Sequence, residues 1–117
     1  MSKQIEQLSR GQLQARIADN PGLVLLEALP EKYYREGHLS GARHMPHDQV
    51  AEFAPRLAPA RDAEIVVYCA SKTCQNSHIA ANHLVQLGYS RVAVYAGGKQ
   101  EWVEAGLPLE AGEVAAV

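Results

Sequence analysis

Three short apolar runs constrain the fold of this chain more than any other feature of its sequence. They cover residues 23–26, 64–68 and 92–95, and they are rich in Val, Ile and Leu without alternating apolar and polar positions. Runs of this length are too short for a buried helix and are typical of strands covered on both faces. Because helical segments lie between them, the pattern predicts an α/β fold with a parallel sheet and helices on both of its faces.

The segments between these runs predict the helices. Ser9 and Gln12 fit a capping box at a helix start, and Leu8 and Leu13 have the spacing of a hydrophobic staple across it. Residues 20–22, Asn-Pro-Gly, are expected to end this helix. The other expected elements are helices over residues 31–36, 49–57 and 77–87, a helix that carries Trp102, and a brief strand over residues 42–45.

Size and charge narrow the classes of protein to which the chain can belong. Its 117 residues, 47% of them hydrophobic, suit a single domain over residues 1–117 with a buried core. The net charge of -2, without any run of like charges, disfavours nucleic acid and acidic membrane surfaces as partners. No segment resembles a signal peptide or approaches the roughly 20 apolar residues of a membrane helix, so we expect a cytoplasmic protein.

Cys69 follows the most apolar run directly, and Cys74 lies five positions beyond it. In the reducing cytoplasm, two cysteines predict a thiol site, a metal site or small buried residues rather than a structural disulfide. Ligand and catalytic sites of parallel α/β sheets lie at the carboxyl ends of the strands, where Cys69 is expected. Cys69 taken alone is equally well explained as a small buried apolar residue.

The loop that Cys69 opens favours a chemical role. It is short and polar, so its backbone N–H groups can curl around an anion, and the helix that follows adds partial positive charge. A thiolate is stabilised in such a setting and is nucleophilic near neutral pH. The candidate binding-loop residues are Ala70, Ser71, Lys72, Thr73, Gln75, Asn76 and Ser77, of which only Lys72 carries a positive charge.

Several segments, taken in order, resemble the rhodanese domain over about residues 8–110. They are Leu25-Leu26-Glu27, the turn from Tyr34 through His38 to Ala42, Ile65 to Cys69, Gly88-Tyr89, Gly97-Gly98 with Trp102, and Ala105 to Pro108. The resemblance implies a sheet of about five parallel strands flanked by helices. It also implies that Cys69 carries a sulfane sulfur as a persulfide, which a second nucleophile then removes, with no metal or organic cofactor.

The chain departs from the family pattern at three places. Glu27-Ala28-Leu29 stands where the family has Asp, a small residue and Arg, and Ser40 replaces the Pro of the turn. The active loop is two residues longer than usual, and Asn76 occupies the position of its Arg. Because a bidentate guanidinium suits the thiosulfate dianion, the loss of both arginines favours a persulfide or polysulfide donor, with Lys72 as a partial substitute.

The second cysteine and two further side chains complete the candidate site. Cys74 can resolve the Cys69 persulfide, accept its sulfur, act as the carrier itself or have no role, and we favour Cys69 as the nucleophile. Glu27 is expected near the site, either accepting N–H groups of the loop or capping the strand end. His38 is expected to hold its turn through a local hydrogen bond. A zinc site is disfavoured, because the spacing of Cys69 and Cys74 fits no common zinc knuckle and because His78 and His83, five positions apart on a helix, point in different directions.

The resemblance therefore predicts a sulfurtransferase that moves sulfane sulfur from a small donor to a low-molecular-weight or protein thiol. A non-catalytic rhodanese-like module for thiol sensing or partner binding is the competing hypothesis. A phosphatase or arsenate reductase is disfavoured, because Gln75 stands where that chemistry needs an arginine. A homodimer is compatible with the size of the chain.

Overall fold

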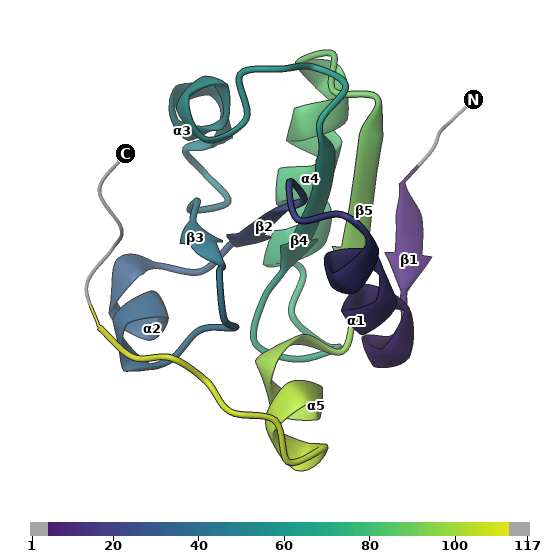
Figure 1. The fold of residues 1–117 in the computed structure, drawn as a ribbon. Coiled ribbons are helices and arrows are strands. Elements are labelled where there is room, and N and C mark those ends of the chain that lie inside the picture. The colour runs from purple at the N-terminus through teal and green to yellow at the C-terminus, as the bar shows by residue number, and fades with distance from the viewer. Residues whose placement is uncertain (1–4, 113–117) are drawn as a thin grey trace.

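The computed structural model describes residues 5–112, and a single parallel sheet organises them (Figure 1). Its five strands lie in the order β1-β5-β4-β2-β3. The strands are β1 (Glu6–Leu8), β2 (Val24–Glu27), β3 (Arg43–His44), β4 (Glu64–Tyr68) and β5 (Arg91–Tyr95). This confirms the predicted α/β class and the parallel sheet of about five strands.

Helices cover both faces of the sheet, as the sequence predicts. They are α1 (Arg10–Asp19), α2 (Glu31–Glu36), α3 (Val50–Leu57), α4 (Asn76–Gln86) and α5 (Gly98–Glu104). The side chains of α3 and α4 pack with one face of the sheet, and those of α1 and α5 pack with the other. Within residues 5–112, none of these helices has both the length and the apolar character that crossing a bilayer requires.

Strand β4 lies at the centre of the sheet and separates the two cores. Ile65 and Val67 belong to the core under α3 and α4, whereas Val66 and Tyr68 belong to the core under α1 and α5. All four side chains are fully buried, which explains why the strand shows no alternation of polarity. Because β4 is flanked by β2 and β5, its carboxyl end is surrounded by the loops that follow those strands.

Strand β1 was not predicted from the sequence. It has three residues, and only Leu8 is buried, so it lacks the apolar run by which the other strands were recognised. Its pairing with β5 is what defines it as a strand. The predicted capping box follows at once: Ser9 Oγ accepts from Gln12 N at 3.1 Å, and Gln12 Oε1 accepts from Ser9 N at 2.9 Å.

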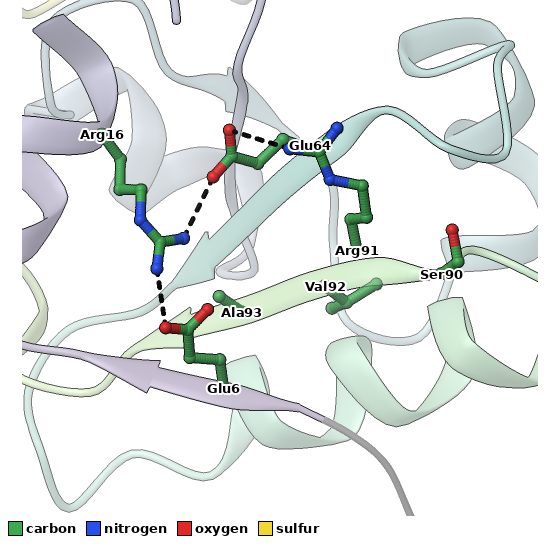
Figure 2. Close-up of a pocket in the computed structure, with 7 residues that line it drawn as sticks. All are labelled: Glu6, Arg16, Glu64, Ser90, Arg91, Val92 and Ala93. Carbon is green, nitrogen blue, oxygen red and sulfur yellow. Dashed lines mark hydrogen bonds and ion pairs between the residues drawn. The ribbon is translucent and has the colours of Figure 1, made fainter. Parts of the chain in front are cut away.

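Charged side chains tie α1 to the amino edge of the sheet (Figure 2). Arg16 reaches Glu6 of β1 at 2.6 Å and Glu64 of β4 at 3.0 Å, and Asn20 donates to Glu64 at 2.9 Å. Arg91 lies 3.7 Å from the Glu64 carboxylate. Glu64 also lines a hollow of about 510 Å³ at this edge of the sheet. The Asn20 hydrogen bond, and then the Arg16 guanidinium, lower the pKa of Glu64 despite its partial burial.

We expect Glu64→Gln to lower the free energy of unfolding at neutral pH by about 1 kcal/mol or less, because the ion pair is partly solvated. A carboxyl whose pKa is lowered by folding contributes stability above its unfolded-state pKa and loses it as the pH falls. The difference between wild type and variant should therefore shrink in acid, as measured by urea unfolding across pH. Glu52→Gln is the control, because Glu52 is exposed and lies 3.9 Å from Arg56. A loss that persists unchanged in acid would contradict the assignment.

Candidate functional site

The first functional side chain stands where β4 ends. Cys69 follows Tyr68 directly and is only 2% exposed. Its carbonyl oxygen accepts from Lys99 N at 3.0 Å, and the Ala70 carbonyl accepts from Gln100 N at 2.9 Å. The start of α5 therefore fixes the backbone of the loop at the point where it leaves the sheet.

A disulfide joins Cys69 to Cys74, with their Cα atoms 6.3 Å apart. The sequence argued only against a structural disulfide and left open whether the two thiols pair; in the structure they are joined. A tight turn accounts for the pairing, because Cys74 N donates to Ser71 O at 3.1 Å and folds the chain back over the strand end. The Ser71 and Thr73 hydroxyl oxygens lie 3.1 Å apart across the same turn.

The rest of the loop lies around the two sulfurs. Ser77, at the start of α4, is 1% exposed, and its Oγ lies 3.6 Å from Cys69 Sγ. The backbone N–H groups of residues 70–73 make no hydrogen bond to an acceptor within residues 5–112. Helix α4 begins after Gln75 without a side-chain cap. Ala70, Lys72, Thr73 and Gln75 are exposed, whereas Ser71, Cys74 and Asn76 are half-buried.

Gly98 allows α5 to approach the loop closely. Its φ is +66°, and a Cβ placed on it would lie 2.5 Å from Cys69 O and 2.8 Å from Ser71 N. Both distances are shorter than van der Waals contact, and the atoms involved are backbone atoms that cannot rotate away. Glycine is therefore required here both by the left-handed backbone and by the space.

We expect Gly98→Ala to displace the loop and to destabilise the protein by more than the roughly 1–2 kcal/mol that a left-handed alanine costs. Gly106→Ala is the matched control, because Gly106 has a φ of +83° and open space around its Cα. Urea unfolding followed by the fluorescence of Trp102, the one tryptophan of the chain, compares the two. Equal losses in both variants would show that the contact with the loop contributes nothing.

Glu27 is fully buried at the carboxyl end of β2. Its Oε1 accepts from the Tyr68 hydroxyl at 2.7 Å, and its Oε2 lies 3.0 Å from Lys99 Nζ. Burial raises the pKa of the Glu27 carboxyl, whereas the Tyr68 hydrogen bond and the Lys99 charge act in the opposite direction. The carboxylate contacts the Tyr68 hydroxyl and Lys99 Nζ, and it makes no hydrogen bond with the N–H groups of residues 69–77.

Lys99 is the residue that sequence reasoning missed. Besides contacting Glu27, its Nζ donates to Tyr33 O at 2.8 Å and to Gly37 O at the end of α2, and its side chain is only 14% exposed. Its backbone N–H holds Cys69 O. Leu29, where the resemblance would place an arginine, is a buried apolar residue. The absence of this arginine was the signal that could have pointed to Lys99. Without the arginine, a buried Glu27 carboxylate needs another cation as its partner.

His38 belongs to the turn beside this ion pair. Its Nδ1 lies 2.8 Å from Tyr34 O, and its ring stacks on the Tyr34 ring with 3.8 Å between centroids. The next residue, Leu39, donates its N–H to the Tyr68 hydroxyl at 3.1 Å. The His38 side chain is therefore engaged within its own turn, and the turn is joined through Tyr68 to Glu27.

We expect Lys99→Met to lower the free energy of unfolding by about 3 kcal/mol or more, because it leaves the buried Glu27 carboxylate without a counter-charge. The double variant Glu27→Gln/Lys99→Met should lose less free energy of unfolding than Lys99→Met alone. The amide that replaces the carboxylate carries no charge to bury, and its oxygen still accepts a hydrogen bond from the Tyr68 hydroxyl. Urea unfolding of the two single variants and the double variant completes the cycle. A double variant less stable than Lys99→Met would contradict this explanation.

The surface next to the loop carries mixed charge. A hollow of about 230 Å³ is lined by Lys72, Gly97, Gln100, Glu101 and Glu104. Two carboxylates thus share this surface with the only cation of residues 69–77. Across residues 5–112, no three His, Cys, Asp or Glu side chains come together as metal ligands.

Comparison with known proteins identifies the family. The model of the rhodanese-like domain matches residues 9–105. The chain belongs to this family. It is 27% identical to a sulfurtransferase of Allochromatium vinosum over 93% of its own length and 98% of that protein's.

Two further likenesses agree with this assignment. The chain is 33% identical to the thiosulfate sulfurtransferase GlpE of Pseudomonas aeruginosa, over 76% of its own length and 77% of GlpE. A crystal structure of the Alr3790 protein from Anabaena sp. superposes with a TM-score of 0.80 at 25% identity, covering 90% of this chain and 80% of that one.

Proposed function

We propose that this rhodanese-like protein is a sulfurtransferase that carries sulfane sulfur as a persulfide on Cys69. The observation that carries the proposal is the position of this cysteine at the carboxyl end of β4, with its sulfur 3.6 Å from Ser77 Oγ. The N–H groups of residues 70–73, in the same loop, have no acceptor among residues 5–112. These donors suit the negative charge of a thiolate or a persulfide. The relatives named as sulfurtransferases support the same reaction class.

The reaction consists of two displacements at sulfur. In the reduced protein, the Cys69 thiolate attacks the sulfane sulfur of the donor, a new sulfur–sulfur bond forms, and the remainder of the donor leaves as an anion. A thiol of the acceptor then attacks the outer sulfur of the persulfide and takes it away, which restores the Cys69 thiolate. Neither step requires a metal or an organic cofactor.

The charges around the loop favour a donor with less charge than thiosulfate. Residues 69–77 contain no arginine, and Lys72 shares its hollow with Glu101 and Glu104. Those carboxylates repel a small dianion, and no guanidinium is present in the loop to bind it bidentately. A persulfide or polysulfide donor, and a low-molecular-weight or protein thiol as acceptor, fit this surface better.

The test is intact-mass analysis after the reduced protein has been incubated with polysulfide or, separately, with thiosulfate. We expect Cys74→Ser to gain one sulfur atom, more readily from polysulfide, and the gain to be absent from Cys69→Ser. The Cys74→Ser background prevents the second thiol from removing the sulfur. If the sulfur is found on Cys69→Ser and not on Cys74→Ser, the second cysteine is the carrier.

A non-catalytic module for thiol sensing or partner binding is the second candidate function, and the Cys69–Cys74 disulfide is the observation that favours it. Such a module would exchange its disulfide with thiols but would acquire no sulfur from either donor. The same mass measurement therefore separates the two functions.

A further inference from the structure

We propose a second activity for this loop: Cys74 resolves the Cys69 persulfide, which releases sulfide and leaves the Cys69–Cys74 disulfide. The proposal rests on the proposed function, because it requires the persulfide to form first. It adds a product, sulfide, and a state of the protein in which the loop is oxidised. The structural basis is that the two sulfurs are bonded to each other in the structure.

The position of Cys74 determines which sulfur it attacks. A persulfide on Cys69 has an inner sulfur, Sγ, and an outer sulfane sulfur. The turn from Ser71 brings Cys74 Sγ onto Cys69 Sγ itself, and the Cys74 N–H bond to Ser71 O at 3.1 Å holds this arrangement. Attack at the inner sulfur expels the outer one, whereas attack at the outer sulfur would only move it to Cys74.

The step balances without an external oxidant. The Cys74 thiolate forms a bond to Cys69 Sγ, the bond between Cys69 Sγ and the outer sulfur breaks, and that sulfur leaves as hydrosulfide. The two cysteine sulfurs are oxidised to a disulfide, and the sulfane sulfur is reduced to sulfide. The N–H groups of residues 70–73 lie in the same loop and suit the anion that departs.

The exposure of the two cysteine residues indicates how the cycle closes. Cys69 is 2% exposed and Cys74 is half-buried, so an incoming thiol reaches Cys74 more readily. Attack on Cys74 Sγ frees the Cys69 thiolate beside Ser77 Oγ, ready to accept the next sulfur. A dithiol reductant suits this step, because its second thiol then releases Cys74 from the mixed disulfide and the reductant becomes a disulfide.

The experiment is a single turnover with reduced, desalted protein, one equivalent of polysulfide, no oxygen and no added thiol. Sulfide is trapped with a bimane reagent, and the protein is examined by intact mass. We expect wild type to release sulfide and to lose the mass of two hydrogens as the disulfide forms. Cys74→Ser should keep the added sulfur. It should release sulfide at least about tenfold more slowly than wild type does, because it lacks the adjacent thiol. Cys69→Ser measures the sulfide that the donor itself releases.

The outcomes separate this inference from the proposed function. If Cys74→Ser gains sulfur but wild type also keeps it, without disulfide or sulfide above the Cys69→Ser level, the resolving role is wrong and the sulfurtransferase stands. Sulfide release by Cys74→Ser at the wild-type rate overturns the resolving role in the same way. If no variant gains sulfur and wild type releases no sulfide above background, both proposals fail.

Discussion

The buried ion pair between Glu27 and Lys99 connects three separate elements of the fold. It links the end of β2 to the start of α5, and through Tyr33 O and Gly37 O it reaches the end of α2. A carboxylate with no solvent exposure requires a counter-charge. Lys99 supplies it, with Nζ 3.0 Å from Oε2, and Tyr68 donates a hydrogen bond to Oε1, whereas Oε2 accepts no hydrogen bond from residues 5–112. The loop above is held by the backbone of the same lysine, so the position of Cys69 depends on this pair.

The loop itself combines a fixed backbone with two sulfurs in bonding contact. Gly98 lets α5 approach the Cys69 and Ala70 backbone, and the turn at Ser71 brings Cys74 back over the strand end. This arrangement suits a sulfur carrier without arginine: loop N–H donors match the charge, and a second thiol stands next to the carrier. The proposed sulfur transfer would take place in a loop whose residues differ from those of the usual family pattern.

Sequence reasoning recovered elements whose signals are local. The apolar run of β4 and the capping box at Ser9 both appear at the predicted residues. It missed β1, because three residues with one buried side chain become a strand only by pairing with β5. It also missed Lys99, which looks like an ordinary helix lysine until the fold buries it against Glu27, a residue from the distant amino-terminal part of the chain.

The sequence by itself determined the α/β class, the place of Cys69 directly after the most apolar strand and the absence of arginine from its loop. These follow from burial patterns and residue chemistry, which act over a few neighbouring positions. Only the tertiary structure decided that Glu27 pairs with Lys99 and that Cys74 meets Cys69. Glu27 and Lys99 are far apart in the sequence, and they become partners because the fold buries both in the same place. Cys74 meets Cys69 because of the direction in which the turn at Ser71 leads the chain, which residue spacing alone does not specify.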